Sequence, residues 1–372
     1  MYASFAKSQK GGVVQTAELL KLFPGEQRTF WAKLAAEQGR VQEIHLQAGQ
    51  PIFVWKEGRE WYLDASGYCT DSRKNARRIT MEEIEQILLH ICHYSLYAYE
   101  DELSQGFLTV EGGHRVGVTG QAVLEEEAKV RTIKHISGMN IRIAHQVKGA
   151  ADKVLSLVYE NRRICNTLII SPPGCGKTTL LRDLVRQISD GNAFGEGKTV
   201  GVVDERSEIA GCFHGIPQND VGIRTFVLDA CPKALGMMML LRSMAPKVIA
   251  IDELGGRKDA QALHMASSCG CSLLATIHGE SMKDICRKEG MEKLMEERLF
   301  ERFLILGRQA GRCVVKAVYG KEYYDTESVG SDFDFGRVCR TGDLLPGAVR
   351  TEDRAYPHSD LYPGSNDQRG PL

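Results

Sequence analysis

The chain has 372 residues, of which 43% are hydrophobic and 26% charged, and its formal net charge is −1. This composition is ordinary for a soluble globular protein with room for two cores, and a near-neutral chain has no overall field that attracts nucleic acid. Eleven cysteines without regular spacing favour reduced thiols in a cytosolic compartment over a disulfide scaffold. The N-terminus lacks a signal-peptide-like apolar segment and no run of 18 apolar residues occurs, so we expect no membrane-spanning segment.

After a flexible start (residues 1–14), residues 15–147 are typical of a small α+β domain. Short apolar runs separated by glycine-containing turns predict strands, and Thr80 with Glu83 forms a capping-box pattern at the start of a helix. The expected strands are 41–46, 51–55, 61–63, 107–110, 115–118 and 140–143. Small residues at 147–151 predict a short helical hinge to the next domain.

Residues 148–322 follow a different pattern, in which a strand, a glycine-rich loop and a helix are followed by further strands. The strands are expected at 167–170, 200–203, 248–251 and 273–276. These runs are apolar without alternation, which is typical of strands covered on both faces, so the sequence predicts an α/β domain with a mostly parallel sheet. Beyond residue 322 the composition shifts to Asp, Gly, Arg, Pro and Ser, which predicts a disordered tail over 323–372.

The stretch SPPGCGKTT is a candidate phosphate-binding loop for ATP. Its residues are Ser171, Pro172, Pro173, Gly174, Cys175, Gly176, Lys177, Thr178 and Thr179. The two glycines let backbone N–H groups turn toward phosphate oxygens, Lys177 places a cation on the β and γ phosphates, and Thr178 offers a hydroxyl to Mg²⁺. Ser171 stands where the usual pattern has its first glycine, and a small residue is expected to be tolerated there.

Acidic residues follow two of the other expected strands. In VIAIDE, Asp252 is positioned to hold Mg²⁺ through water, and Glu253 to polarise the attacking water. In VVDERSE, Asp204, Glu205 and Glu208 are expected at the same edge, because ligands of parallel sheets gather at the carboxyl ends of the strands. Glu205 and Glu208 are alternative bases, and a merely solvated acidic loop is the other interpretation.

A fourth strand ends in ATIHG, with Thr276 and His278. A histidine at this position can hydrogen-bond the γ-phosphate or Glu253 and so respond to hydrolysis. A purely structural histidine is the alternative.

The segments SPPGCGKT, VVDERSE, VIAIDE and ATIHG, in this order, resemble the Walker A, Asp, Walker B and His boxes of the type II/type IV secretion ATPases. Residues 111–120, 136–144 and 218–255 resemble the branch of that family that acts in bacterial endospore formation. The resemblance runs from about residue 15 to residue 320. It implies a RecA-like P-loop NTPase domain preceded by a smaller α+β N-terminal domain.

The resemblance also implies a homo-oligomeric ring, with a hexamer expected, that drives a secretion-like complex between mother cell and forespore. The protein would then lie in the cytoplasm, held at a membrane by integral-membrane partners. In related rings the N-terminal domain contributes arginines to the nucleotide, and the matching regions here contain Arg115, Arg131 and Arg142. Arg224 and Arg242 are equally good candidates for contacts between subunits. Each of these arginines can instead be an ordinary surface residue.

Two other functions stay open at this stage. A RecA-like nucleic-acid motor would require a basic groove rich in aromatic residues, which a net charge of −1 and 7% aromatic residues disfavour. A nucleotide-dependent scaffold with little turnover is compatible with the same loop, although the Asp252–Glu253 pair argues for chemistry.

Overall fold

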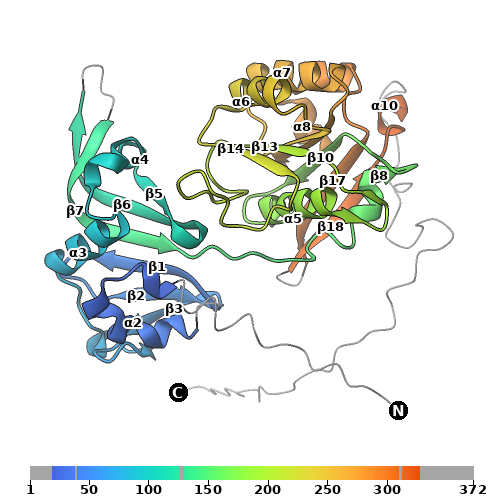
Figure 1. Cartoon of the computed structure of the whole chain (residues 1–372). Coiled ribbons are helices and arrows are strands. Elements are labelled where there is room, and N and C mark those ends of the chain that lie inside the picture. The colour runs from blue at the N-terminus through green and yellow to red at the C-terminus, as the bar shows by residue number, and fades with distance from the viewer. Residues whose placement is uncertain (1–18, 38–39, 126–129, 310–311, 327–372) are drawn as a thin grey trace, which may run out of the picture.

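Two seven-stranded sheets organise the computed structural model of the chain (Figure 1). The structure describes residues 19–37, 40–125, 130–309 and 312–326. The first sheet belongs to the N-terminal half and is entirely antiparallel, and the second is parallel except at one edge. None of the described helices combines the length and apolarity needed to cross a membrane.

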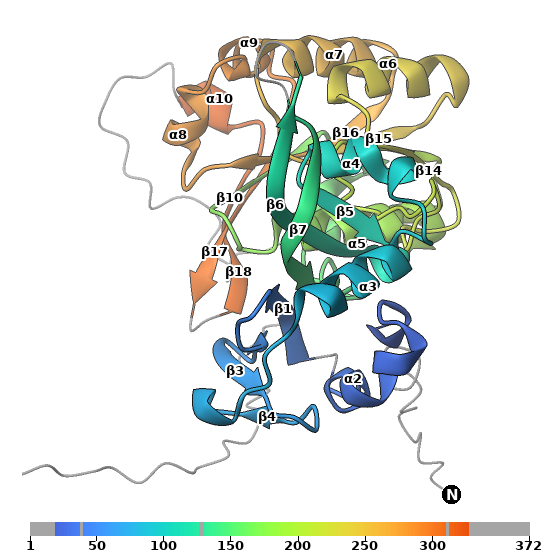
Figure 2. The ribbon, with the colours of Figure 1, turned by 90° about the vertical axis from the view of Figure 1, so that its left-hand side faces the viewer.

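The N-terminal half folds around the strand order β4-β3-β2-β1-β7-β6-β5. Its strands are β1 (Val41–Gln47), β2 (Phe53–Lys56), β3 (Arg59–Leu63), β4 (Cys69–Thr70), β5 (Phe107–Val110), β6 (His114–Leu124) and β7 (Val130–Arg142). Its helices are α2 (Arg28–Ala35), α3 (Met81–Ile91) and α4 (Glu100–Ser104), with 3-10 turns at Gly25–Gln27, Arg73–Asn75, Leu96–Tyr99 and Glu111–Gly113. β6 and β7 form one long hairpin (Figure 2).

Helix α3 shows how the sequence pattern becomes structure in this half. The Thr80 hydroxyl accepts the N–H of Glu83, and the Glu83 carboxylate accepts the N–H of Thr80, so the predicted capping box is present. The apolar residues at helical spacing then lie buried on one face, against the sheet. Met81, at the first position of the helix, stays 39% exposed.

The second sheet has the order β14-β13-β15-β16-β10-β17-β18, and every pair in it is parallel except β17–β18. Its strands are β10 (Thr167–Ser171), β13 (Val200–Asp204), β14 (Thr225–Asp229), β15 (Val248–Ile251), β16 (Ser272–His278), β17 (Arg302–Gln309) and β18 (Arg312–Tyr319). Its helices are α5 (Lys177–Asp190), α6 (Lys233–Ser243), α7 (Arg257–Ser268), α8 (Met282–Cys286), α9 (Met291–Glu296) and α10 (Tyr323–Thr326). A 3-10 turn (Leu155–Val158) and two small ribbons, β8 (Tyr159–Glu160) with β9 (Arg163–Ile164) and β11 (Gly191–Asn192) with β12 (Gly195–Glu196), complete it.

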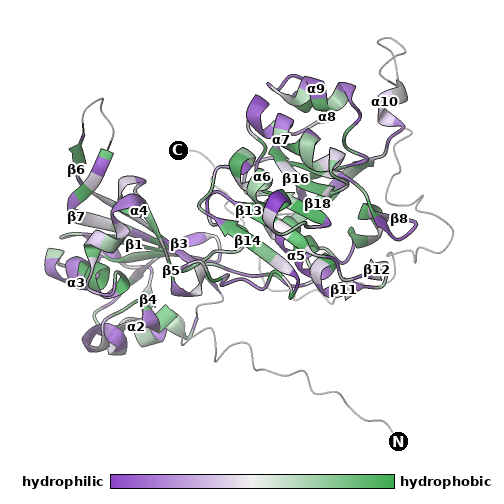
Figure 3. Ribbon diagram, turned by 45° about the horizontal axis from the view of Figure 1, so that its top comes forward, coloured by the Kyte–Doolittle hydropathy of each residue, from purple (hydrophilic) through white to green (hydrophobic). Residues whose placement is uncertain are grey.

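Two hydrophobic cores lie on opposite faces of this sheet. Successive residues of β10 alternate between them: Leu168 and Ile170 pack with α7 to α9, and Ile169 packs with α5. α6 and α7 therefore cover one face and α5 the other, as Figure 1 shows. The hydropathy colouring agrees, because the inner strands are hydrophobic and the outer helices carry hydrophilic residues (Figure 3). Burial on both faces is why these strands lack polar alternation.

The four strands expected in this half are present, and three more join them. β14 was not predicted because its residues are only partly buried, and β17 and β18 lie in a stretch where glycine and charge interrupt the apolar runs. Tyr323 and Tyr324, the first residues of the expected tail, are 7% and 8% exposed. Tyr324 donates its hydroxyl proton to the carbonyl of Phe300 at 2.9 Å, so the packed body includes them. Residues 327–372 lie outside the described residues.

The link between the halves, expected as a helical hinge at 147–151, forms turns. Lys148 pairs with Asp220 at 2.5 Å, and the backbone N–H of Ala151 donates to Asp183 on α5 at 2.8 Å. Gln146 also bonds the backbone of Asp220. The link is therefore attached to the second half within the expected hinge and at the residue just before it.

His114, the first residue of β6, is buried beside this link. Its Nδ1 accepts the backbone N–H of Ala144 at 3.0 Å, so the ring is neutral. Burial, with a smaller effect of His145, lowers the pKa of His114 from 6.5 to about 4. Between pH 6.5 and about 4, His114 therefore binds a proton in the unfolded chain but stays neutral in the folded chain.

We expect the free energy of unfolding to fall as pH drops from 6.5 toward 4, by about 3 kcal/mol at about 1.4 kcal/mol per pKa unit. His114→Gln keeps an acceptor but does not titrate, so it should flatten this part of the pH dependence in denaturant-induced unfolding. Burial raises the pKa of Asp204 to about 6, so this residue increases the free energy of unfolding as the pH falls and opposes the effect of His114. The parent and the variant share this contribution, and comparing them at each pH therefore isolates His114. Identical slopes for both proteins would contradict the assignment.

Candidate nucleotide-binding site

The carboxyl ends of β10, β13, β15 and β16 lie at one edge of the second sheet, and the four sequence motifs follow these ends. Ser171, the last residue of β10, is in register with His278, the last residue of β16. Parallel pairing thus brings together segments more than a hundred residues apart in the chain.

The phosphate loop leaves β10 and enters α5 through two left-handed residues. Gly174 has φ +69° and Gly176 has φ +78°, a region that favours glycine. Gly176 directly precedes α5, so the loop's N–H groups and the helix N-terminus point at the same space. Ser171 is fully buried in the strand, and its φ is not positive, which explains why serine is acceptable where the usual pattern has glycine.

Of the remaining loop residues, Cys175 is buried, whereas Pro173 is exposed. Pro172 and Thr179 are half-buried, as are Lys177 and Thr178. Lys177 and Thr178 are thus accessible enough to contact a ligand, and their roles in binding phosphate and Mg²⁺ stay predictions.

Asp252 is held between two hydroxyl groups. Thr178 donates to Asp252 Oδ2 at 2.9 Å, and Thr276 donates to Oδ1 at 2.6 Å. Thr276 also accepts the backbone N–H of Glu253 at 3.0 Å, so one side chain orients both acids. A threonine hydroxyl beside a carboxylate is the donor set that suits Mg²⁺ bound together with phosphate oxygens and water. Within the described residues, no three His, Cys, Asp or Glu side chains gather as a protein-only metal site.

Lys177, His278 and Glu253 form a continuous row. Lys177 Nζ lies 3.2 Å from His278 Nε2, and the same nitrogen lies 3.4 Å from Glu253 Oε1. Nε2 can accept from Lys177 in one tautomer or donate to Glu253 in the other, but not both at once. Glu253 has φ +47°, an uncommon conformation for a residue other than glycine, and such strain is typical of functional sites.

Asp204 shapes the neighbouring acidic loop from within. It is 1% exposed, and its carboxylate accepts the backbone N–H groups of Glu208, Ile209 and Ala210 at 2.8 to 3.2 Å. Burial raises its pKa to about 6, although these hydrogen bonds act in the opposite direction. From α5, Arg182 donates to the carbonyls of Glu208 and Ile209 at 2.6 and 2.5 Å. Asp204 therefore organises the loop rather than facing a ligand.

The other two acids of this loop have partners elsewhere. Glu205 pairs with Lys233 at the start of α6, and Glu208 pairs with Arg115 of β6 at 3.2 Å. Among the described residues, neither forms a hydrogen bond or ion pair with the phosphate loop. A role for Glu205 as the base stays a prediction, with Glu253 better placed.

The three arginines considered in the N-terminal half lie apart from the phosphate loop in this chain. Arg115 is bound to Glu208, and Arg142 lies 3.5 Å from Glu43 and is largely exposed. Arg131 is exposed on β7. Contact with a nucleotide therefore stays a prediction for each of them, and it would require a second subunit or a rotation of the N-terminal half.

The two arginines considered in the second half differ from each other. Arg224 donates to the carbonyls of Ser189 and Asp190 at 2.9 and 3.4 Å, so it caps the end of α5 remote from the phosphate loop. Arg242 is exposed in the last turn of α6. Of the two, Arg242 presents the freer side chain for an intersubunit contact.

Two residues that the motifs did not single out also belong to the site. Arg206 lies 3.5 Å from Glu253, and Arg308 of β17 donates to the carbonyl of Gly174 at 2.9 Å. Arg206 is part of VVDERSE, so its position in that motif was a usable signal. Arg308 follows no motif and is brought to the loop only by the pairing of β17 with β10.

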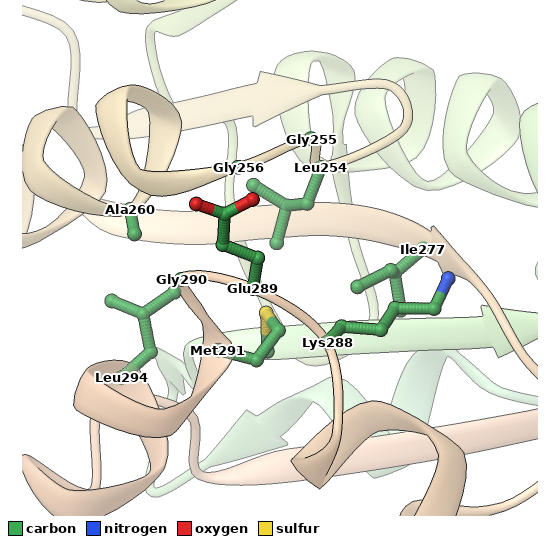
Figure 4. Close-up of a pocket in the computed structure, with 10 residues that line it drawn as sticks. All are labelled: Leu254, Gly255, Gly256, Ala260, Ile277, Lys288, Glu289, Gly290, Met291 and Leu294. Atoms are coloured by element: carbon green, nitrogen blue, oxygen red, sulfur yellow. The ribbon is translucent and has the colours of Figure 1, made fainter.

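A separate cavity of about 290 Å³ lies behind residues 254–256, which follow Glu253 (Figure 4). Leu254, Ile277, Met291 and Leu294 line it together with Lys288, Glu289 and glycine backbone, and Lys288 donates to the carbonyl of His278. None of residues 171–179 of the phosphate loop lines this cavity, so it is separate from the candidate nucleotide site.

The chain matches a known protein family. Residues 14–324 match the family described as "Sporulation stage III, protein AA". Stage III sporulation protein AA of Bacillus subtilis (strain 168) is 40% identical over 306 residues, which cover 82% of this chain and 95% of that protein.

Solved structures show the same fold. The ATPase DotB of Legionella pneumophila has a TM-score of 0.53 at 17% identity, covering 82% of this chain and 84% of DotB. The pilus retraction motor PilT, solved with bound ADP, has a TM-score of 0.53 at 15% identity, covering 80% and 86%. The expected α/β fold of the secretion ATPases is thereby confirmed, and the chain belongs to the sporulation stage III protein AA family.

Proposed function

We propose that this protein is an ATP-hydrolysing motor of a secretion-like complex in endospore formation. The observation that carries the proposal is the convergence of Lys177, Asp252, Glu253 and His278 at one edge of the sheet, around a phosphate loop. The family supports the sporulation role, and the fold shared with DotB and PilT supports ATP as the fuel.

Each side chain has a definite task in this proposal. Lys177 and the loop N–H groups bind the β and γ phosphates. Thr178 and Asp252 hold Mg²⁺, which neutralises phosphate charge when bound. Glu253 accepts a proton from the attacking water as the water adds to the γ-phosphorus and the bond to the ADP oxygen breaks. Thr276 keeps both acids in place.

His278 connects phosphate binding to the base. A γ-phosphate attracts Lys177 more strongly than a neutral imidazole does, so ATP binding frees His278 Nε2. Exchange of protons with solvent converts the ring to the tautomer that carries its proton on Nε2, and Nε2–H then donates to Glu253 or to the phosphate. The row Lys177–His278–Glu253 thus responds to the presence of the γ-phosphate.

The motor acts as a ring, with a hexamer expected, whose N-terminal halves move against the second halves. Arg115, Arg131 or Arg142 then reaches a nucleotide, in the same subunit or the next one. The ring docks on integral-membrane components from the cytoplasmic side. A scaffold with little turnover remains the second candidate, because Glu253 pairs with Arg206 and must be released before it can accept a proton.

Lys177→Ala should abolish ATP binding or weaken it by about 10- to 100-fold, because a charge-assisted contact to phosphate is lost. Calorimetric titration with Mg·ATP measures this directly. Lys153→Ala, at an exposed lysine in a turn, is the matched control. Unchanged ATP affinity in a folded Lys177→Ala protein would remove the site assignment.

Glu253→Gln should bind Mg·ATP but hydrolyse it about 10²- to 10⁴-fold more slowly, because the amide cannot accept the proton. The release of phosphate is measured. Glu280→Gln is the control, because Glu280 is an exposed glutamate that follows β16. Near-parental turnover would shift the role of base to Glu205 or Glu208. If the parent itself releases no phosphate with or without its membrane partner, the scaffold is favoured.

Mg·ATP should promote a hexamer-sized species of the parent, because the predicted arginine contacts close on the nucleotide across subunits. Light scattering of the eluting protein, with ATP, with ADP and with neither, measures this. Lys177→Ala should show no ATP-dependent shift. A chain that stays monomeric at high concentration while hydrolysing at full rate would contradict ring assembly.

A further inference from the structure

The outer end of the β17–β18 pair touches both glycine turns of the phosphate loop. Arg308 Nη2 donates to the carbonyl of Gly174 at 2.9 Å. Cys313, paired with Arg308 in the antiparallel register, places its Sγ 3.4 Å from the position that a Cβ on Gly176 would take. This edge of the sheet therefore forms a wall beside the loop.

The two sides of β10 differ in chemistry. On the side of β16 and β15 lie Asp252, Glu253 and His278, the groups suited to Mg²⁺ and the γ-phosphate. On the opposite side of β10, β17 contributes Arg308, and no carboxylate among the described residues pairs with this arginine. A nucleotide with its γ-phosphate toward the acids can place its nucleoside on the opposite side of β10, beside β17.

Arg308 has the properties that a nucleobase contact requires. Its side chain is exposed, and among the described residues it makes no ion pair. The bond to Gly174 uses one of five guanidinium donors and fixes the side chain beside the loop. The planar guanidinium face is left free, and such a face stacks on aromatic rings.

We propose that Arg308 is a nucleobase-binding residue, whose guanidinium plane stacks on the base of a nucleotide bound in the phosphate loop. This inference rests on the proposed function of that loop. Arg308 acts on the nucleoside end and leaves the grip on the terminal phosphates to Lys177.

The test compares ADP with inorganic tripolyphosphate, which has phosphates but no base, by calorimetric titration of the full chain. Loss of base stacking in Arg308→Ala should weaken ADP binding about 10-fold and leave tripolyphosphate binding within about twofold. Arg308→Lys keeps the charge without the plane, so it should resemble the alanine variant. Arg59→Ala, at an exposed arginine of β3 in the N-terminal half, is the matched control.

The other outcomes overturn the inference in distinguishable ways. Equal weakening of both ligands with rescue by lysine would show a phosphate contact, and unchanged ADP affinity would show no contact. If Arg308→Ala does not fold, Arg308→Lys alone tests the inference. Its affinity for ADP should then fall relative to its affinity for tripolyphosphate. Failure of the proposed function looks different, because the parent would then bind neither ligand, or Lys177→Ala would bind both normally.

Discussion

The burial of β10 between β16 and β17 is the constraint on which the rest of the site depends. Leu168, Ile169 and Ile170 are fully buried, and they alternate between the two cores of the sheet. This fixes where the strand ends and therefore where Gly174 and Gly176 turn. The loop's N–H groups are preorganised by apolar packing on both faces, so binding phosphate requires little reordering of the backbone.

Helix α5 is connected to the N-terminal half through a series of side-chain contacts. Arg182 on this helix holds the carbonyls of residues 208 and 209, and Asp204 holds the N–H groups of the same loop. Glu208 then binds Arg115 of β6. Contacts thus connect α5 with the first sheet, and the last of them, the Arg115–Glu208 ion pair, is the one that must open if Arg115 moves to a nucleotide.

The sequence predicts those parts of the site that depend on residues close together in the chain. The phosphate loop and the capping box at Thr80 depend on residues a few positions apart, and the acids after β15 follow a recognisable buried strand. Arg308 depends instead on which strand pairs with β10, and a lone arginine near a glycine carries no local signal. The pairing of Glu205 with Lys233, and the structural role of Asp204, are equally invisible, because an acidic motif does not show which carboxylate is buried.

Three cations lie at the candidate site, and their partners in the chain differ. Lys177 rests against His278, Arg206 against Glu253, and Arg308 against a neutral carbonyl. Among the described residues, Lys177 and Arg308 have only neutral partners, so a polyphosphate gains attraction there without breaking an ion pair. Arg206 is different, because it pairs with Glu253, the group proposed to accept a proton. In the proposed mechanism, nucleotide binding therefore requires no ion pair to open, whereas hydrolysis requires the Arg206–Glu253 pair to open, and a motor that couples turnover to a partner needs such a separate step.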